Sequence, residues 1–506
     1  MQPTETKGFV VHTPVHGEGR GKTPSNELLK GRFTRIRTVR TGLDRPCFVG
    51  LVVCLLMLTV VSAPSPVRAR RLAADQANAQ KGSWRRLPPL IVKAPPKPAG
   101  SPLPRTWVSW ADGPTHDATY QDHTIHLPGG RAVRVGGPIV DGPAVIRPGI
   151  AYVGDNTDWV EAWNLTSDTE LWAVHVPNMV MTTPLAVKAG GSRLLVIVGL
   201  GNNGFLGYRS GQGWIRGTGY NAIVAFNART GALVWTAQTV GEDMATPVVW
   251  HGRLYEATGA GNLVALSVKT GRVLWKIHLG GFDSMSSPAL SGHLLFFATN
   301  LYLSNYPATR SVLWAVNLQR RSVQWQTALP VASGLSDCSP AVAAGRVFIA
   351  GITKIGEQDR RPWLTARLFA LQTTTGRVLW SQPLGSGSMS LDREEVGIPA
   401  VVGQKVFVAS PPAHRVYAFS LNGHLNWSTS LGADAATGSP AIWGHTVVWA
   451  TKRGRLVMLA RNNGRFLSAL QLSTGAFGPG SPLVVNRTLV IPTLSGWFDV
   501  VALKTR

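Results

Sequence analysis

The stretch ATPVVWHGRLYEATGAGNLVALSVKTGRVLWKIHL, residues 245–279, contains four short apolar segments separated by tight turns. The segments PVVW, LYEAT, LVALS and VLWKIHL are separated by HGR, GAGN and KTGR, in which glycine and polar residues are typical of turns. Apolar residues at every second position indicate strands, because that spacing places them on one face. No 3.6-residue period favours a helix here. The stretch therefore predicts four short strands.

This pattern recurs along the chain, and a repeat of this kind indicates one supersecondary unit used many times. A proline opens the first strand of each of eight copies: Pro143, Pro184, Pro247, Pro288, Pro340, Pro399, Pro440 and Pro482. A tryptophan closes the fourth strand in six copies: Trp172, Trp235, Trp275, Trp325, Trp380 and Trp427. The eighth copy reaches Leu503 without a closing strand. We expect residues 131–135 (RAVRV) to supply that strand and to close a ring.

The recurring elements S/T-P-x-V, x-G-x-L-Y and L-V-A-L-x-x-x-T-G-x-x-x-W resemble those of pyrroloquinoline-quinone-like repeat β-propellers. The resemblance covers residues 106–506. It implies an all-β, eight-bladed β-propeller with four-stranded blades, in which the N-terminal strand closes the last blade. The family includes quinone-dependent dehydrogenases and non-catalytic scaffolds similar to the outer-membrane assembly lipoprotein, so the fold leaves the function open.

The residues before the propeller fall into three segments. Residues 1–46 are polar and basic without an apolar period and are expected to be disordered. Residues 47–63 (CFVGLVVCLLMLTVVSA) carry no charge and predict a single hydrophobic helix, either a transmembrane anchor or a cleaved signal. Residues 64–105 form a Pro-rich basic linker. We expect a single-pass protein of the cell membrane with an extracytoplasmic propeller, or a secreted protein if the signal is cleaved.

The blade topology predicts two faces of different character. Turns between strands 1 and 2 and between strands 3 and 4 lie on one face, which we call the basic face because Arg253, Lys269 and Arg272 and their equivalents fall there. The other, loop-rich face carries the 2–3 turns, the crossovers between blades and the insertions 201–219, 300–310 and 353–367. Its crossovers contain the acidic residues Glu242, Asp243, Asp283, Asp392, Glu394, Glu395 and Asp434.

These faces suggest partners. The acidic crossovers predict a partner-binding surface on the loop-rich face for a cell-envelope protein or polymer. Because the closing strand must start at the basic face, the linker is expected to leave there, which would turn that face to the membrane or to anionic wall polymer. The alternative is a solvated basic rim. The net charge of +24 does not favour nucleic acid, because no recognised nucleic-acid motif is present and the propeller is expected to be exported. A monomeric propeller is expected.

Methionines form a second candidate constellation. Met181, Met244 and Met285 each lie three residues before an opening proline, and Asp337 takes the same place in the next copy. Equivalent positions of a propeller meet near its axis, so these side chains predict a soft-metal site suited to Cu(I). The alternative is an apolar plug beneath the loops.

The resemblance also raises the question of a quinone cofactor. Enzymes of this fold hold pyrroloquinoline quinone (PQQ) against a tryptophan and a disulfide of adjacent cysteines, with calcium bound by carboxylate and amide ligands. This chain has no adjacent cysteine pair, and Cys338 is its one cysteine beyond the apolar segment. We therefore expect no cofactor and no catalytic residue, and we favour a membrane-tethered scaffold. A quinoprotein-like oxidoreductase and an extracytoplasmic sensor are the alternatives.

Overall fold

The computed structural model describes residues 119–120, 125–126, 130–145, 149–209, 213–301, 310–388, 396–472, 475–485, 488–502 and 504–505. All regular structure in these ranges is β-strand. The predicted tail, hydrophobic helix and linker, residues 1–105, lie outside them. Within the described ranges, no helix has the length and apolar character needed to cross a membrane.

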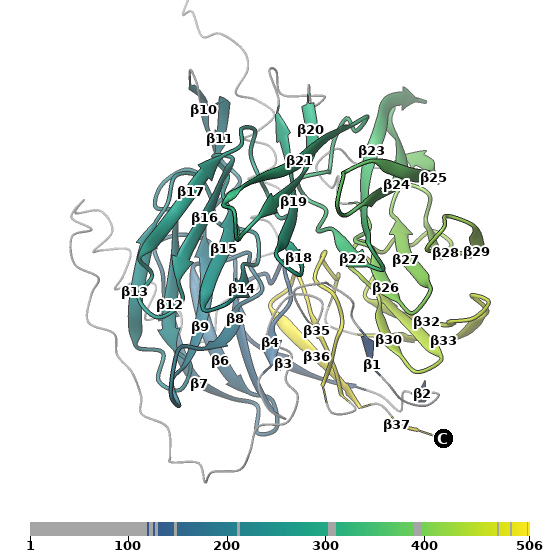
Figure 1. Cartoon of the computed structure of the whole chain (residues 1–506). Coiled ribbons are helices and arrows are strands. Elements are labelled where there is room, and N and C mark those ends of the chain that lie inside the picture. Colours follow the sequence, from purple (N-terminus) through teal and green to yellow (C-terminus); the bar gives the residue numbers. More distant parts are fainter. Residues whose placement is uncertain are drawn as a thin grey trace, which may run out of the picture. The chain divides into compact units, whose positions relative to one another are not determined.

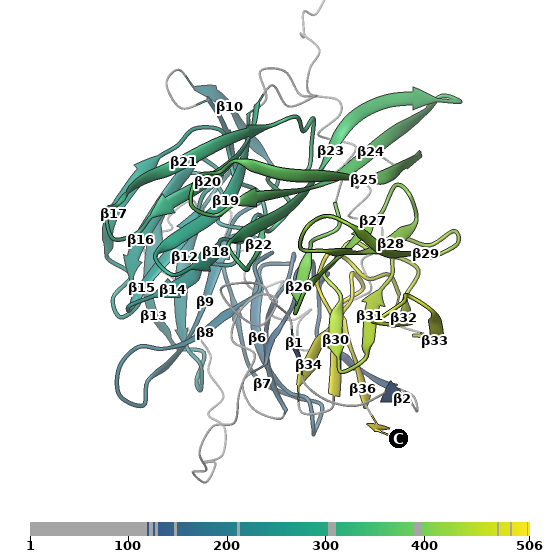
Figure 2. The same ribbon diagram turned by 45° about the vertical axis from the view of Figure 1, so that its right-hand side comes forward.

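Four-stranded antiparallel sheets follow one another as blades (Figure 1, Figure 2). Blade 1 contains β4 (Ala144–Val145), β5 (Ile150–Gly154), β6 (Trp159–Asn164) and β7 (Thr169–His175). Blade 2 contains β8 (Leu185–Lys188), β9 (Leu194–Leu200), β12 (Ala222–Asn227) and β13 (Leu233–Gln238). Blade 3 contains β14 (Val248–Trp250), β15 (Arg253–Ala257), β16 (Asn262–Ser267) and β17 (Val273–His278). Blade 4 contains β18 (Ala289–Ser291), β19 (Leu294–Leu301), β20 (Arg310–Asn317) and β21 (Ser322–Leu329).

The second half repeats the arrangement. Blade 5 contains β22 (Ala341–Ala343), β23 (Arg346–Gln358), β24 (Arg361–Gln372) and β25 (Val378–Ser388). Blade 6 contains β26 (Ala400–Val402), β27 (Lys405–Ser410), β28 (Arg415–Ser420) and β29 (Leu425–Ser430). Blade 7 contains β30 (Ala441–Trp443), β31 (Thr446–Ala450), β32 (Arg455–Ala460) and β33 (Phe466–Gln471). Blade 8 contains β34 (Leu483–Val485), β35 (Thr488–Pro492), β36 (Trp497–Ala502) and β3 (Gly130–Arg134).

The ring closes as the sequence predicts. Strand β3 pairs antiparallel with β36, from Gly130 opposite Val501 to Arg134 opposite Trp497. The predicted closing strand is therefore confirmed, with bounds shifted by one residue. Next to it, β2 (Ile125–His126) pairs antiparallel with β37 (Lys504–Thr505), so the two ends of the propeller hold each other.

A short strand near the start of the propeller adds a fifth strand to blade 7. Strand β1 (Thr119–Tyr120) pairs in parallel with β30, the innermost strand of blade 7, and so lies on the axial side of that blade. Strand β30 starts after a crossover and runs from the loop-rich face to the basic face, and β1 runs the same way. The linker itself lies outside the described residues, so its expected departure from the basic face stays a prediction.

The closing tryptophans join neighbouring blades in a repeated contact. Trp235 Nε1 donates a hydrogen bond to the carbonyl oxygen of Val268 at 3.0 Å. Its ring lies against Gly271, where an added Cβ would stand 2.4 Å from the ring. Gly271 has a φ of +68°, so this turn needs glycine for its backbone as well as for the close approach. Trp172, Trp325, Trp380 and Trp427 make the same pair of contacts with the next blade.

Three seams depart from this contact. Between blades 7 and 8, Ser468 of β33 occupies the tryptophan position. At blade 4 the glycine is replaced by Arg321, with a φ of +55°, and the Nε1 of Trp275 has no hydrogen-bond partner. At the ring closure, Arg131 of β3 occupies the tryptophan position and forms an ion pair with Asp168, which occupies the glycine position. Both side chains of that pair are more than 40% exposed, so this ion pair contributes little to stability. The closing seam is packed instead by a buried apolar cluster that joins β3 and β36 to β5.

The Ser or Thr before an opening proline links neighbouring blades by a hydrogen bond, which explains the S/T-P pattern. The backbone N–H of Thr183 donates to Thr246 Oγ1 at 3.1 Å, that of Thr246 to Ser287 Oγ at 2.9 Å, and that of Ser287 to Ser339 Oγ at 3.0 Å. The same bond links Gly142 to Thr183 and Ser439 to Ser481. A buried N–H needs a partner, and the hydroxyl of the following blade supplies it.

Candidate functional site

Four carboxyl groups lie together in the interior at the loop-rich end of blades 2 to 4. Glu242 and Asp243 belong to the crossover between β13 and β14, Glu256 lies near the end of β15, and Asp283 belongs to the crossover between β17 and β18. Each is at most 1% exposed. We call these four residues the acid cluster.

The acid cluster has few hydrogen-bond donors facing it. Among the described residues, neither carboxyl oxygen of Glu242 or Glu256 has a hydrogen-bond partner, and one oxygen each of Asp243 and Asp283 has none. Burial raises the pKa of all four carboxyls well above the ordinary range, and neighbouring carboxylates raise the pKa values of Glu242, Glu256 and Asp283 further. These groups therefore hold their protons to a higher pH than exposed acids do.

One basic side chain contacts this region. The Arg216 Nε lies 3.3 Å from Glu242 Oε1, and its Nη1 lies 3.7 Å from Asp337 Oδ1. Its Nη2 donates to the side-chain oxygen of Asn203 at 3.1 Å. The side chain of Asp337 is 28% exposed, whereas that of Glu242 is fully buried. Asp337 is thus the carboxyl of this group that solvent reaches.

Arg216 is carried by the insertion in blade 2, residues 201–219, which folds into the hairpin of β10 (Phe205–Arg209) and β11 (Gly213–Arg216). Figure 1 and Figure 2 place this hairpin at the same end of the propeller as the extended strands β23 and β24. The backbone of Arg216 is fixed on both sides, since its N–H donates to Gly259 and its carbonyl accepts from Glu242. A Cβ at Gly217 or Gly259 would come within 2.4 Å of this backbone, so glycine allows the close docking.

The three predicted methionines do come together. Met181 and Met244 are buried against Val140, and Met285 and Leu494 pack against them. The cluster is apolar, as the plug alternative requires. Asp337, the fourth member of the predicted metal set, contacts Arg216 instead. A Cu(I) site at the methionines stays a prediction.

The predicted acidic face is built differently from expectation. Glu242, Asp243 and Asp283 belong to the buried acid cluster, and Asp434 is 3% exposed. Asp434 accepts hydrogen bonds from the Thr451 hydroxyl at 2.6 Å and from two backbone N–H groups, so it organises a turn. Asp392, Glu394 and Glu395 lie outside the described residues. The four described carboxyls are thus not displayed to solvent, and partner binding at this face stays a prediction.

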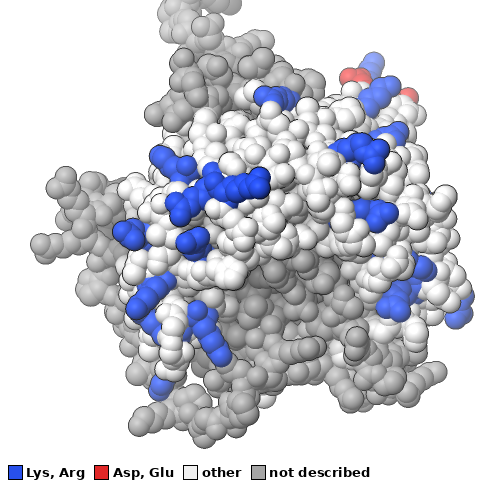
Figure 3. All heavy atoms as spheres, viewed as in Figure 1, with Lys and Arg blue, Asp and Glu red and all other residues white. Residues whose placement is uncertain are grey.

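On one side of the molecule, the charged side chains at the surface are mostly basic (Figure 3). On the side shown in Figure 3, Lys and Arg are spread over the described surface, whereas Asp and Glu appear at one corner only. The burial of the acid cluster is one reason for this imbalance.

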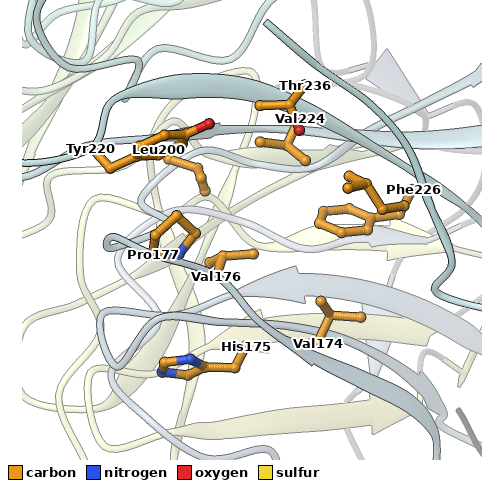
Figure 4. Close-up of a pocket in the computed structure, with 10 residues that line it drawn as sticks. Val174, His175, Val176, Pro177, Leu200, Tyr220, Val224, Phe226 and Thr236 are labelled. Atoms are coloured by element: carbon orange, nitrogen blue, oxygen red, sulfur yellow. The ribbon is translucent and has the colours of Figure 1, made fainter. Parts of the chain in front are cut away.

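A small apolar pocket lies between the outer strands of blades 1 and 2. Its walls include Val174 and His175 of β7 and Val224 and Phe226 of β12, with Tyr220 at one side (Figure 4). The lining contains no carboxylate and no cation besides the imidazole. We assign no chemistry to it.

The quinone features implied by the family resemblance fit this chain poorly. Cys338 is a free, buried cysteine, and burial raises the pKa of its thiol to about 12, so it is neither half of an adjacent-cysteine disulfide nor a ready nucleophile. Among the described residues, no three His, Cys, Asp or Glu side chains are arranged to hold a metal ion. We derive no step through a quinone.

Sequence reasoning missed Arg216 and Glu256. Arg216 lies in the insertion 201–219, which does not follow the repeat pattern of the blades, so nothing in the sequence marks it as a site residue. Glu256 was detectable in principle, because it is a charged residue inside the strand LYEAT whose neighbours are apolar on both sides.

Comparisons with known proteins agree on the fold and point to two kinds of function. A family model described as outer membrane protein assembly factor BamB matches residues 156–352 and 302–491. Tetrathionate hydrolase of Acidithiobacillus ferrooxidans is 29% identical over 378 residues, which cover 72% of this chain and 72% of that protein. Tetrathionate hydrolase of Acidianus ambivalens is 27% identical over 302 residues, covering 56% of this chain and 55% of that protein.

Solved structures share the architecture at low identity. BamB from Moraxella catarrhalis superposes with a TM-score of 0.53 and 14% identity, covering 75% of this chain and 100% of that one. Quinohemoprotein alcohol dehydrogenase from Comamonas testosteroni superposes with a TM-score of 0.51 and 11% identity, and the match covers 79% of this chain and 80% of that one. A europium-containing methanol dehydrogenase superposes with a TM-score of 0.54 and 12% identity, and the match covers 78% of this chain and 98% of that one. These similarities establish the fold alone.

Proposed function

This chain belongs to the PQQ-like repeat β-propeller family of the outer membrane protein assembly factor BamB, and within that family we propose that it is a hydrolase of polythionate anions. The observation that carries the proposal is the 29% identity, over 72% of both chains, with a tetrathionate hydrolase. The second relative carries the same activity in its name. A catalytic role replaces the scaffold as the favoured function.

The chemistry of the reaction suits the acid cluster. Tetrathionate is a dianion with a sulfonate group at each end of a sulfur chain. When water attacks a sulfonate sulfur, the bond to the chain breaks, and sulfate, a three-sulfur monosulfonate and two protons result. An ionised acid cluster would repel such a dianion. Because burial raises the pKa of its four carboxyls, the cluster holds its protons to a higher pH than exposed acids do and leaves Arg216 as the nearby cation.

Asp337 is the group that we assign to proton movement. It is the solvent-accessible carboxyl beside Arg216, and it occupies the repeat position whose equivalents, Met181, Met244 and Met285, pack together in one cluster. A carboxyl at this place can accept a proton from the attacking water or donate one to the departing sulfur chain.

The test is turnover of tetrathionate by the purified protein from about pH 3 to pH 7, with sulfate and sulfur oxyanions measured by ion chromatography. We expect activity in acid that declines as the pH rises and the acid cluster ionises. Asp337→Asn should lower kcat by about 100-fold or more, as loss of a general acid or base does. Asp359→Asn, in an exposed turn between β23 and β24, is the matched control. Full activity of Asp337→Asn would remove the assigned role, and no turnover by the wild type would remove the hydrolase.

The second candidate is the scaffold. The match to the BamB family model supports it, and so does the similarity to the Moraxella catarrhalis protein. In that case the propeller would be tethered outside the cell membrane by residues 47–63 and would bind an envelope protein or polymer through the loop-rich face. Deletion of residues 201–219 should then change the set of proteins cross-linked in membranes, and an unchanged set would exclude this face.

A further inference from the structure

We infer that Arg216 is a binding residue for a sulfonate or sulfate group, and that the anion replaces Asp337 as the partner of its guanidinium. The identity of the anion as the end of a polythionate rests on the proposed function. That Arg216 binds an anion follows from the geometry of the arginine and is independent of that function.

The contacts of Arg216 divide into one that orients it and two that are loose. The Nη2 hydrogen bond to Asn203 at 3.1 Å orients the guanidinium, and its Nε lies 3.3 Å from Glu242 Oε1 without forming a hydrogen bond to it. The Nη1 contact with Asp337 at 3.7 Å exceeds normal hydrogen-bond length. A guanidinium has five N–H donors in a fork that matches tetrahedral oxyanions. The donors on Nη1 are therefore available to a ligand oxygen.

The position of the arginine is set before any ligand arrives. Its N–H donates to Gly259 O at 2.9 Å, and its carbonyl accepts from Glu242 N at 2.8 Å, so blade 3 holds the end of β11 from both sides. Gly217 and Gly259 permit this approach, because a Cβ at either would collide with the opposing backbone. A fixed donor costs less to order on binding than a mobile surface arginine.

The charge of Arg216 is also available. Among the described residues it is the basic side chain that ion pairs link to Glu242 and Asp337. Glu242 is fully buried, and burial raises its pKa although Arg216 acts in the opposite direction, so Glu242 competes for the positive charge less than an exposed carboxylate would. Asp337 also competes for that charge, and it does so from a distance at which an anion with direct hydrogen bonds would prevail.

A structural ion pair is the competing interpretation, and kinetics separates the two. We expect Arg216→Gln to raise the KM for tetrathionate by about 10- to 100-fold while kcat changes less, since a charge-assisted contact to a sulfonate that is already charged in the substrate supports binding. Arg216→Lys should recover part of the loss, because it restores the charge without the fork. Arg310→Gln, an exposed arginine of β20 that contacts Gln326, is the control and should leave KM unchanged.

A second variant protects the test against misfolding. Asn203 is exposed, so Asn203→Ala should fold normally while losing the bond that orients Nη2, and KM should rise several-fold. An unchanged KM in both Arg216→Gln and Asn203→Ala would overturn the inference while leaving the hydrolase intact.

Calorimetric titration with tetrathionate and with thiosulfate covers the case in which no turnover is found. Anion binding that Arg216→Gln abolishes would sustain the inference even if the wild type hydrolysed nothing. Anion binding of equal strength in wild type and Arg216→Gln would refute it.

Discussion

The acid cluster makes the stability of this propeller depend on pH in an unusual direction, and Glu256→Gln tests it. Glu256 is 0% exposed, neither of its carboxyl oxygens has a hydrogen-bond partner, and its pKa is raised first by burial and then by Asp243 and Asp283. The folded state therefore binds this proton more tightly than the unfolded chain does. Stability from this group is complete below the ordinary Glu pKa of about 4.3 and is lost as the pH rises.

The magnitude follows from proton linkage. Each pH unit above the ordinary Glu pKa over which the native carboxyl stays protonated costs about 1.4 kcal/mol of unfolding free energy. Between that pKa and pH 7, the ceiling is about 4 kcal/mol. Gln has nearly the shape of the protonated acid and does not titrate. Glu256→Gln should thus lie within about 1 kcal/mol of wild type at about pH 3 and should be clearly more stable than wild type at pH 7.

The assay is urea unfolding of both proteins at several pH values, with Glu170→Gln, an exposed residue of β7, as the control. The difference between Glu256→Gln and wild type should grow with pH, whereas that of Glu170→Gln should stay small. A constant difference across the range, or one that grows toward acid, would show that the carboxylate is accommodated in the folded state and would refute the reasoning.

Three further outcomes test the packing. Trp235→Phe should lose about 1 kcal/mol more stability than Trp275→Phe in thermal unfolding, because only the first indole has a hydrogen-bond partner; equal losses would contradict this. Gly271→Ala should destabilise more than Gly252→Ala, since both need positive φ but only Gly271 touches a tryptophan ring, and urea midpoints compare them. Cys338 should resist thiol reagents until the protein unfolds, and rapid labelling of the native state would contradict its burial.

Local patterns were enough to predict the strands, the blades and their number. Residues 245–279 yielded four strands because alternation and glycine turns act over a few residues, and the repeat then multiplied that unit. The closing role of residues 131–135 followed from counting strands. The pairing of β1 with β30 was not predicted, because it joins segments more than 300 residues apart and neither segment carries a local pattern for it.

The sequence by itself determined the eight-bladed architecture, since opening prolines, closing tryptophans and turn glycines each report on neighbours within one or two strands. Only the tertiary structure decided the chemistry of the loop-rich end. The acidic crossover residues Glu242, Asp243 and Asp283 are buried there, and the insertion carrying Arg216 is hydrogen-bonded to the backbone of Glu242 and Gly259. Whether a carboxyl is exposed and ionised or enclosed and protonated depends on such non-local packing, because desolvation is set by everything that surrounds the group.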